Sequence, residues 1–217
     1  MKLFIDSGNI KDIETLASIG IIDGVTTNPT LLAKEPGDYR DNLKKICQIV
    51  KGPVSGEVTA TDFAGMLRQG HDIAGIDEHM IVKVPLTRDG IKACKALSGE
   101  GIRVNVTLCF SAAQALLAAK VGATFISPFV GRLDDIATNG MDLIREIVDI
   151  YDNYDFTTEV LVASCRHPIH VVEAARMGAD IATCPAAVID QLFNHPLTNI
   201  GLEKFLKDWE KSQAVKA

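Results

Sequence analysis

Short apolar runs alternate with amphipathic helical patterns along the chain, and this alternation predicts repeated strand–helix units around a parallel sheet. The runs predicted to be strands cover residues 3–6, 24–27, 53–59, 80–86, 103–109, 125–130, 159–164 and 181–185. Helical patterns cover residues 10–19, 38–51, 61–74, 88–99, 111–120, 134–152, 168–178 and 186–193. Ser111 is placed to cap one helix, and Gly20, Gly122 and Gly178 are placed to end others.

The number of units favours one architecture. Eight strand–helix units in 217 residues predict a single-domain (β/α)8 TIM barrel, an α/β fold that runs from about 200 residues upward. A doubly wound open sheet would usually need fewer strands. We therefore expect one barrel domain over residues 1–217, with an additional C-terminal helix at approximately 199–214.

An apolar stripe runs along that C-terminal helix. Leu202, Phe205, Leu206 and Trp209 fall at helical spacing, i, i+3, i+4 and i+7, so they share one face. The pattern allows two interpretations, because the stripe can cover this subunit's own barrel or contact another subunit. We favour a homo-oligomer.

Polar and apolar residues alternate within several predicted strands, and alternate residues of a strand face opposite sides. The polar sets are Ser55, Glu57 and Thr59 in the third strand, Lys83 in the fourth, Asn105 and Thr107 in the fifth, and Ser164 and Arg166 in the seventh. The apolar sets include Val82 and Val84, then Val104, Val106 and Leu108, and finally Leu161 and Ala163. Because the outer face of a barrel packs on helices, we expect the apolar sets outside and the polar sets inside.

Lys83 lies in the apolar run MIVKVPL and is the most informative of these residues. Desolvation penalises a charged amine, and a neutral amine can attack a carbonyl to form a Schiff base. Asp6 and Glu57 are predicted to face the same interior, where charges are costly unless they pair or react. A plain buried ion pair is the alternative interpretation, and an isolated polar residue such as Thr107 is more often structural than catalytic.

The ends of three strands carry further candidates. Pro29 biases Asn28 toward an extended conformation at the end of the second strand. Arg132 and Arg166 follow the sixth and seventh strands, and two guanidinium groups at one rim suggest an oxyanion such as phosphate. Pairing with the loop carboxylates Asp134 or Asp135 is the alternative. The glycine-rich phosphate loop of many barrels is missing between residues 163 and 168.

Composition and charge narrow the class of protein to which the chain can belong. The net charge of −6, without a basic run, argues against nucleic acid as a partner. A membrane span needs about 20 consecutive apolar residues, and no stretch approaches that length. The first residues lack a signal-peptide pattern, so we expect no membrane association and a cytoplasmic protein.

The five cysteines are scattered, and we expect them to be reduced and mostly buried. No histidine–carboxylate spacing indicates a metal, so neither metal nor cofactor is expected, and His167 and His170 are interpreted as exposed or helix-capping residues.

Seven motifs then identify a family resemblance over nearly the whole chain. They are FIDS at the start, GVTTNPTLLAKE, VSGEVT, IVKVPLT, NVTLCFS, SPFVGRLDDI and LVASCRHP. Together they resemble the transaldolases, in particular the small single-domain branch that also contains the fructose 6-phosphate aldolases. That branch forms pentameric rings, often doubled to decamers, in which the C-terminal helix reaches a neighbour.

The resemblance implies a role for each candidate. Lys83 stands where the family has its Schiff-base lysine, and Asp6 corresponds to the acid–base residue for carbon–carbon cleavage. Glu57 and Thr107 correspond to the pair that holds a catalytic water. The amides that hold the dihydroxyacetone portion are matched by Asn28 and Asn105, with Ser127 and Phe129 beside the bound donor, while the sugar-phosphate positions are matched by Arg132, Ser164 and Arg166.

Two positions distinguish transfer from simple cleavage. The aldolases of this branch typically carry Gln at the position of Glu57 and Tyr at that of Phe129. A Tyr hydroxyl can protonate the carbanionic intermediate and release dihydroxyacetone, which Phe cannot do.

These positions predict a transaldolase of the pentose phosphate pathway. It would move a dihydroxyacetone unit between sedoheptulose 7-phosphate or fructose 6-phosphate and an aldose phosphate, either erythrose 4-phosphate or glyceraldehyde 3-phosphate. The alternative is a fructose 6-phosphate aldolase. A phosphosugar isomerase or epimerase, or a non-catalytic sugar-phosphate-binding barrel, is more distant.

Overall fold

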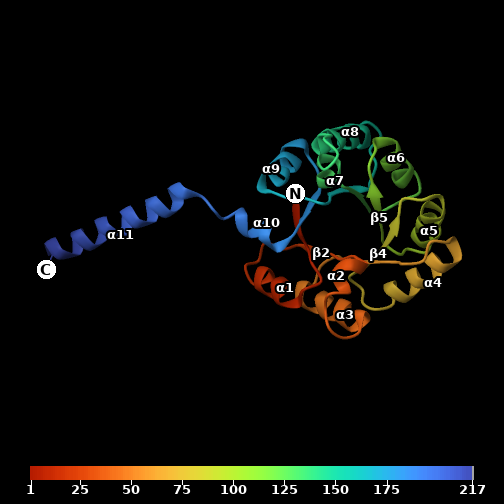
Figure 1. Ribbon diagram of the computed structural model, residues 1–217, viewed down its shortest axis with the longest axis horizontal. Coiled ribbons are helices and arrows are strands. Elements are labelled where there is room, and N and C mark those ends of the chain that lie inside the picture. The colour runs from red at the N-terminus through yellow and green to blue at the C-terminus, as the bar shows by residue number, and fades with distance from the viewer. Residues whose placement is uncertain (217) are drawn as a thin grey trace.

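The computed structural model describes the backbone of residues 1–216 and the side chains of residues 1–214. Its strands close into one barrel in sequence order, β1 to β8, and each strand pairs with both neighbours in parallel. Helices surround the barrel, as Figure 1 shows in a view along its axis. The predicted (β/α)8 barrel is therefore confirmed.

The strands begin close to where the alternation predicts them, and several are shorter. They are β1 (Lys2–Asp6), β2 (Gly24–Thr26), β3 (Val54–Glu57), β4 (Met80–Pro85), β5 (Val104–Cys109), β6 (Phe125–Pro128), β7 (Glu159–Val162) and β8 (Ile181–Cys184). The third, sixth and seventh predicted strands each run two residues too far. Beyond the observed strand ends, Val130 already begins a helix, Phe129 and Ala163 pair only as an isolated bridge, and Val58, Thr59 and Ser164 lie in loops.

The helices also follow the prediction, with two additions. They are α1 (Ile10–Ala17), α3 (Tyr39–Val50), α4 (Phe63–Ala74), α5 (Arg88–Gly99), α6 (Ala112–Lys120), α8 (Gly140–Asn153), α9 (Pro168–Met177), α10 (Ala186–Gln191) and α11 (Pro196–Lys216). The additions are the short helices α2 (Pro29–Leu32) and α7 (Val130–Asp134), each directly after a strand. The helix expected from residue 134 instead begins at Gly140, because the Asn139 side chain caps it there.

The predicted helix boundaries have local causes. Ser111 accepts a hydrogen bond from the Gln114 N–H and begins α6, as expected. Gly178 ends α9 in the left-handed conformation, with a φ of 86° that side chains rarely adopt. Gly20 and Gly122 follow α1 and α6 with similar positive φ values.

The barrel interior holds two layers of side chains. The polar layer, toward the carboxyl ends of the strands, contains Asp6, Glu57, Lys83, Asn105, Thr107 and Ser127. The apolar layer, toward their amino ends, contains Phe4, Ile81, Phe125, Leu161 and Ile181, which pack together as a cluster separate from the main core. Phe4 and Phe125 meet edge to face, with ring centroids 6.1 Å apart.

This arrangement corrects the prediction for the seventh strand. Leu161 and Ala163 belong to the interior cluster, so the apolar set of this strand faces inward. Ser164 and Arg166 lie beyond the end of β7, and Ser164 has a φ of 60°, which breaks the alternation there. A barrel interior needs apolar filling as well as polar groups, so an apolar residue is not a reliable sign of the outer face.

The fifth strand contains one irregular position. Val106 pairs with Ile126 and Cys109 with Pro128, so β5 holds one residue more than β6 between these pairs. Leu108 takes up the extra residue with a φ of 61°. Cys109 instead joins Val104 and Val106 in the outer core, which corrects the prediction that Leu108 shares their face.

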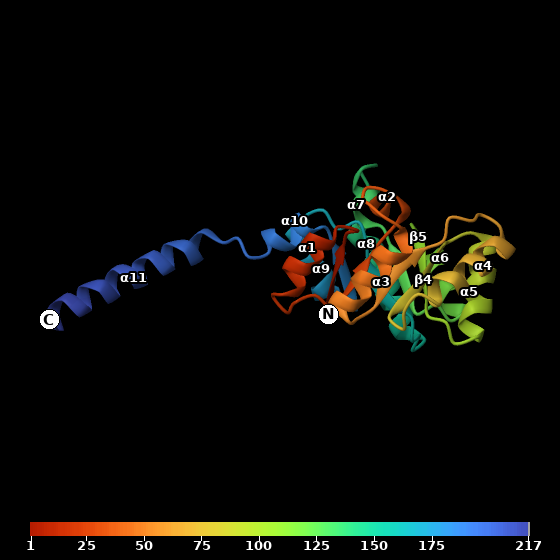
Figure 2. The same cartoon turned by 90° about the horizontal axis from the view of Figure 1, so that it is seen from below.

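Helix α11 does not cover its own barrel. It projects away from the rest of the chain in two perpendicular views (Figure 1, Figure 2). Its apolar residues are exposed, including Phe205 at 72% and Trp209 at 64%. The interpretation in which the stripe packs on this subunit's barrel is therefore wrong.

Candidate active site

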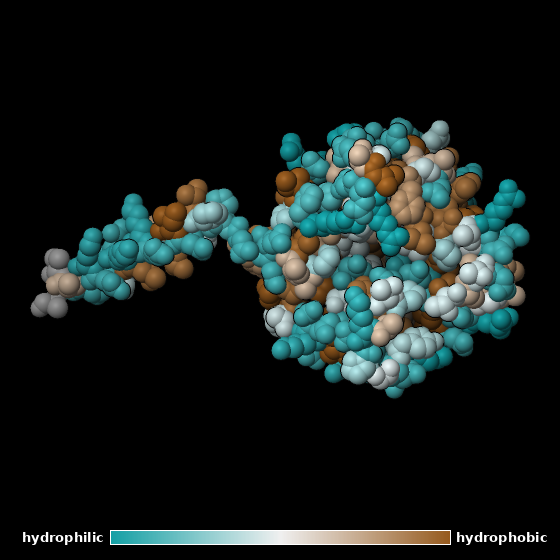
Figure 3. Space-filling view, in the orientation of Figure 1, coloured by the Kyte–Doolittle hydropathy of each residue, from teal (hydrophilic) through white to brown (hydrophobic). Residues whose placement is uncertain are grey.

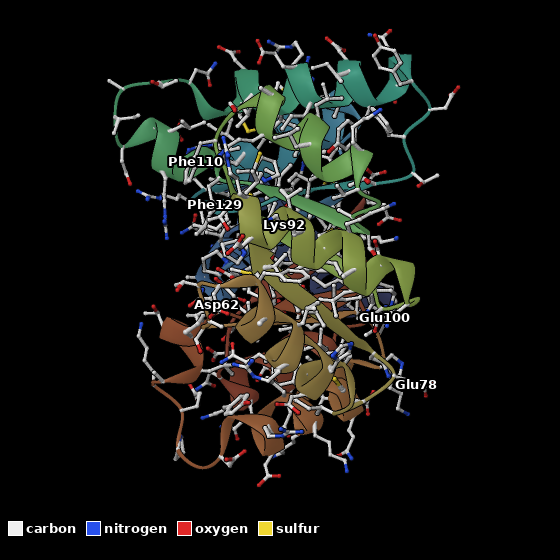
Figure 4. All side chains as sticks on the ribbon, turned by 90° about the vertical axis from the view of Figure 1, so that its right-hand side faces the viewer. Asp62, Glu78, Lys92, Glu100, Phe110 and Phe129 are labelled. Atoms are coloured by element: carbon white, nitrogen blue, oxygen red, sulfur yellow. The ribbon has the colours of Figure 1, made fainter. Side chains whose placement is uncertain are left out.

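The candidate site lies at the carboxyl ends of the strands. In Figure 4, Asp62, Phe110 and Phe129 lie at this end of the barrel, whereas Glu78 and Glu100 lie at the opposite end. Figure 3 looks onto the carboxyl ends and shows a hollow at the centre of the barrel. This is the end at which barrel enzymes place their catalytic groups.

A small cavity under this hollow gathers most of the predicted site residues. It has a volume of about 120 Å³ and is lined by Asp6, Thr26, Asn28, Lys83, Ser127, Phe129, Arg132, Ala163, Ser164 and Thr183. A larger cavity of about 580 Å³ lies beside α2 and α3 and reaches Glu57 but not Lys83. We place the chemistry in the smaller cavity, because it holds the buried amine and the converging polar groups.

Lys83 is buried at the centre of the polar layer. The register sets Glu57 of β3 beside Lys83, and Asn105 of β5 on its other side. Lys83 Nζ lies 3.0 Å from Glu57 Oε2 and donates a hydrogen bond to the Thr27 carbonyl at 3.1 Å. The pair can therefore exchange a proton, which a neutral lysine nucleophile requires.

Asp6 faces the same cavity from β1. Thr26 Oγ1 donates to Asp6 Oδ1 at 2.7 Å, and the same hydroxyl lies 2.7 Å from Thr183 Oγ1. Burial raises the pKa of Asp6, although the Thr26 hydrogen bond and the Lys83 charge act in the opposite direction. A carboxylate with a raised pKa is a stronger base, as proton transfer to and from a sugar hydroxyl requires.

Two residues fix the orientation of the Asn105 amide. Asn105 Nδ2 donates to Ser55 Oγ at 3.2 Å, and Ser127 Oγ donates to Asn105 Oδ1 at 2.8 Å. All three residues are buried. The chain thus holds an amide rigidly beside Lys83, whereas a solvent-exposed amide could rotate.

Thr107 differs from the other members of the polar layer. Its Oγ1 is the one buried side-chain nitrogen or oxygen without a hydrogen-bond partner among the described residues. A buried hydroxyl without a partner costs about 1–3 kcal/mol. The fold therefore keeps a polar atom in the interior that nothing in the described chain uses.

Asn28 takes the conformation that Pro29 imposes. Its backbone is extended, with a φ of −149°, and its Oδ1 accepts the Leu31 N–H at 2.9 Å to cap α2. Because the oxygen is used as a cap, the amide N–H groups are the donors that this residue can offer to the cavity.

The two arginines of the rim differ. Arg132 lies over the Phe129 ring, with its guanidinium carbon 4.9 Å from the centroid, and lines the cavity. It forms no salt bridge within the described part of the chain. Arg166 instead forms a two-pronged ion pair with Asp135, and its guanidinium does not line the cavity. The sequence leaves phosphate and a loop carboxylate open as partners of the two arginines. For Arg166 the structure shows the carboxylate partner.

Three residues of the site were not among the candidates. Thr26 and Thr183 connect to Asp6, and Ser55 holds the Asn105 amide. Alternation within β2 and β8 could have indicated the two threonines. In the register Thr26 pairs with Asp6 and Thr183 pairs with Phe4, so both threonines stand at inward-facing positions. His170 is only 4% exposed, so the interpretation of this residue as surface-exposed is wrong.

Comparisons with known proteins agree with this geometry. Residues 3–216 match the family described as Transaldolase/Fructose-6-phosphate aldolase. The chain is 59% identical to a "Probable transaldolase" of Anaeromyxobacter sp. (strain K), with 97% of each chain covered. A "Probable transaldolase" of Nitrosopumilus maritimus is 56% identical, with 99% of this chain and 97% of the relative covered.

A solved structure shows the same fold at a greater distance. The thiamine phosphate pyrophosphorylase of Pyrococcus furiosus superposes with a TM-score of 0.60 at 15% identity, covering 86% of each chain. At this identity the likeness concerns the barrel alone. No helix in the described part of the chain has the length and apolar character needed to cross a membrane.

Proposed function

The chain belongs to the transaldolase/fructose-6-phosphate aldolase family, and from this membership we propose that it is a transaldolase whose nucleophile is Lys83. The donor is a ketose phosphate and the acceptor an aldose phosphate, as in the conversion of fructose 6-phosphate with erythrose 4-phosphate. The observation that carries the proposal is the buried Lys83 amine, 3.0 Å from Glu57 in the polar layer and lining one cavity with Asp6.

The first stage forms the Schiff base. Transfer of a proton from Lys83 to Glu57 leaves the amine neutral, and its lone pair adds to the C2 carbonyl of the ketose. Glu57 then protonates the resulting hydroxyl, which departs as water and leaves an iminium. Thr107, with its unpaired hydroxyl, is the group that we assign to hold this water together with Glu57.

The second stage breaks the carbon–carbon bond. Ionised Asp6 takes the proton of the C4 hydroxyl, the C3–C4 bond breaks, and its electron pair moves into the iminium to form an enamine. The aldose phosphate departs. In reverse, the enamine attacks the carbonyl carbon of the acceptor, Asp6 returns its proton to the new alkoxide, and water releases the product from Lys83.

Remaining polar groups orient the substrate. We assign Asn28, Asn105 and Ser127 to the dihydroxyacetone portion. Arg132 and Ser164 are assigned to the phosphate end, because both line the cavity at the rim. Arg166 contributes to the same end, where its charge is shared with Asp135.

Phe129 supports transfer over simple release. It lines the cavity and has no hydroxyl with which to protonate the enamine. Fructose 6-phosphate aldolase activity, the second candidate, belongs to the same family and would use the same lysine. The two differ in whether dihydroxyacetone leaves before an acceptor arrives.

The proposed assembly is a homo-oligomer, a pentamer or a decamer, in a cytoplasmic enzyme. Its support is helix α11, whose exposed apolar residues include Leu197, Phe205 and Trp209. An apolar face of this kind is normally buried in the working form of a protein. Size-exclusion chromatography with light scattering distinguishes a monomer, a pentamer and a decamer.

Borohydride trapping tests the chemistry. Incubation with fructose 6-phosphate and sodium borohydride should give a covalent adduct on Lys83, detected by intact-mass and peptide mass spectrometry. Lys83→Met should give none. Absence of an adduct on the native enzyme would contradict the Schiff base and favour an isomerase or a binding protein.

A product assay tests the type of reaction. Native enzyme should convert fructose 6-phosphate faster when erythrose 4-phosphate is present, with sedoheptulose 7-phosphate as product. Turnover that is independent of the acceptor and yields free dihydroxyacetone would indicate the aldolase. Activity should survive EDTA, because the iminium accepts the electron pair.

A further inference from the structure

His170 lies in the first turn of α9 and is joined to two other elements. Its Nδ1 accepts the backbone N–H of Arg166 at 3.2 Å, and its Nε2 lies 2.9 Å from Asp134 Oδ2 at the end of α7. Asp134 Oδ1 in turn accepts the Gly140 N–H at 2.9 Å. The imidazole therefore bridges the loop after β7 and helix α7.

These contacts determine the tautomer. A backbone N–H can only donate, so Nδ1 of His170 must be unprotonated and Nε2 must carry the hydrogen that is given to Asp134. The ring is neutral in this arrangement. Burial lowers the pKa of His170, and the nearby His167 acts in the same direction, while Asp134 and Glu173 oppose them.

The same contacts argue against a metal at this place. Asp134, His167 and His170 bring potential ligand atoms within 4.8 Å of one another. A metal-bound histidine normally donates its second ring N–H to an acceptor. His170 has no such hydrogen, because its Nδ1 faces the Arg166 N–H. A cation at Nε2 would require loss of that hydrogen bond, so the cluster fits a hydrogen-bonded clamp better than an ion site.

The clamp consists of His170, the Arg166 N–H and Asp134. It joins α7 to the loop after β7, and these two segments carry Arg132 and Ser164, the residues assigned to the phosphate. The start of α7 is already joined to the loop, because the Val130 and Gly131 N–H groups donate to the Ala163 and Ser164 carbonyls. The two elements approach so closely that a Cβ on Gly131 would overlap the Ser164 carbonyl oxygen. At the other end of α7, consecutive carboxylates bind the loop: Asp134 through His170 and Asp135 through Arg166.

We propose that His170 is a positioning residue that fixes Arg132 relative to Ser164 and thereby sets the affinity for the phosphate end of the acceptor. His170 does not line the cavity and acts only through Asp134 and the Arg166 backbone. The inference rests on the proposed transaldolase function, because it assumes that Arg132 and Ser164 meet a phosphorylated aldose.

Two substitutions separate the two halves of the clamp. His170→Asn places an oxygen near the position of Nδ1 and keeps the acceptor for Arg166 N–H. His170→Gln places an amide N–H near the position of Nε2 and keeps the donor for Asp134. Each removes one hydrogen bond, so each should raise KM for erythrose 4-phosphate about tenfold. KM for unphosphorylated erythrose and borohydride trapping with dihydroxyacetone should stay as in the native enzyme.

His167→Gln is the matched control. The His167 ring lies against the His170 ring, with centroids 3.8 Å apart and planes tilted by 37°, but its side chain makes no capping hydrogen bond at the start of α9. The KM values of the His167→Gln variant should match those of the native enzyme. Equal changes for the phosphorylated and unphosphorylated acceptors in the His170 variants would overturn the inference, as would no change for either.

A variant of the partner carboxylate tests the clamp without changing His170, in case the His170 variants misfold. Asp134→Asn retains an oxygen for the Gly140 N–H but turns an NH2 group toward the Nε2–H of His170, and it should reproduce the selective KM increase. Native enzyme that traps no ketose would defeat the proposed function itself. Native enzyme that traps ketose and prefers the phosphorylated acceptor, together with unchanged variants, would defeat only the clamp.

Discussion

The two layers of the barrel interior share one parity on the strands but have opposite characters. The polar layer packs a charged pair, amides and hydroxyls around Lys83. The apolar layer, one level closer to the amino ends, contains two phenylalanine rings in edge contact and aliphatic side chains. The same inward direction therefore serves chemistry at one end of the strands and stability at the other.

Position along a strand, and not only the face, therefore decides the role of an inward residue. Groups of the polar layer depend on one another through hydrogen bonds, so substitution there should change catalysis. Groups of the apolar layer are hydrocarbon side chains that pack together as a cluster, so substitution there should change the free energy of unfolding. Four substitutions test this division.

Asp6→Asn should separate catalysis from stability most strongly. Asn cannot accept the C4 hydroxyl proton, so kcat should fall about 10²–10⁴-fold, while the Asn oxygen can still accept from Thr26. Steady-state turnover of fructose 6-phosphate with erythrose 4-phosphate measures the loss.

The stability of the same variant has a defined pH dependence. Burial raises the folded-state pKa of Asp6, so the folded state holds this proton more tightly than the unfolded state. The contribution of Asp6 to stability is greatest below its unfolded pKa and is lost as pH rises through the raised folded value. Asp6→Asn should therefore gain stability relative to the native enzyme as pH rises toward neutrality, in urea unfolding. A difference that is constant with pH would show that desolvation does not raise the pKa of Asp6.

Phe125→Ala tests the apolar layer. Deleting the ring leaves a cavity beside Phe4 and should lower the free energy of unfolding by about 3–5 kcal/mol, while kcat of the folded enzyme stays within a few-fold of native. Phe110→Ala is the control for the free energy of unfolding, because Phe110 is 37% exposed and lies outside the barrel interior. A loss of turnover as large as that of Asp6→Asn would end the division between the layers.

Thr107→Val sharpens the comparison at a single atom. The substitution removes a buried hydroxyl that has no partner in the described chain, so stability should be unchanged or rise by about 1 kcal/mol. Activity should nevertheless fall about tenfold or more, because the water that we assign to Thr107 and Glu57 would lose a contact.

Thr158→Val is the matched control for Thr107. Thr158 is also buried, but its hydroxyl donates to the Ala123 carbonyl at 2.6 Å at the amino end of the barrel. Its loss should lower the free energy of unfolding by about 1–3 kcal/mol and leave turnover unchanged. The reverse pattern in the two threonine variants would contradict the assignment of Thr107 to the reaction.

Phe129→Tyr should have the smallest effect. A phenol hydroxyl beside the enamine can protonate it, so the ratio of free dihydroxyacetone to transfer product should rise by a few-fold. Both products are measured in one reaction by coupled assays, and an unchanged ratio would remove Phe129 as the reason for transfer. Stability should change little, because the ring is only partly buried at the rim.

The sequence predicted the closed barrel from its eight strand–helix units, and the polar layer from the alternation of polar and apolar residues within the strands. Lys83, Glu57 and Asn105 face the interior, as their parity predicted, and the register sets them side by side on adjacent strands. The apolar layer was assigned to the outside in β7, because Leu161 looks the same in the sequence whether it faces helices or the barrel axis. Alternation also fails where a residue has positive φ, as at Leu108 and Ser164.

The pairings around α7 follow only in part from local patterns, because the sequence offers Asp134 or Asp135 as a partner of the rim arginines without choosing between them. The bond between His170 and Arg166 and the pair between Arg166 and Asp135 depend on how α7 meets the loop after β7. No spacing along the chain determines that contact. The direction of α11 is of the same kind, since an apolar stripe indicates that a helix will be covered but not by which surface.

The extra residue in β5 has a chemical consequence at the entrance. Without Leu108 in its unusual conformation, regular alternation would place the Cys109 thiol on the inward parity and Phe110 on the outward one. With it, Cys109 is fully buried in the outer core, and Phe110 meets Phe129 with ring centroids 5.8 Å apart. Sugar aldehydes are electrophiles that thiols capture, so this single bulge keeps a competing nucleophile away from the incoming carbonyl and surrounds its path with inert rings.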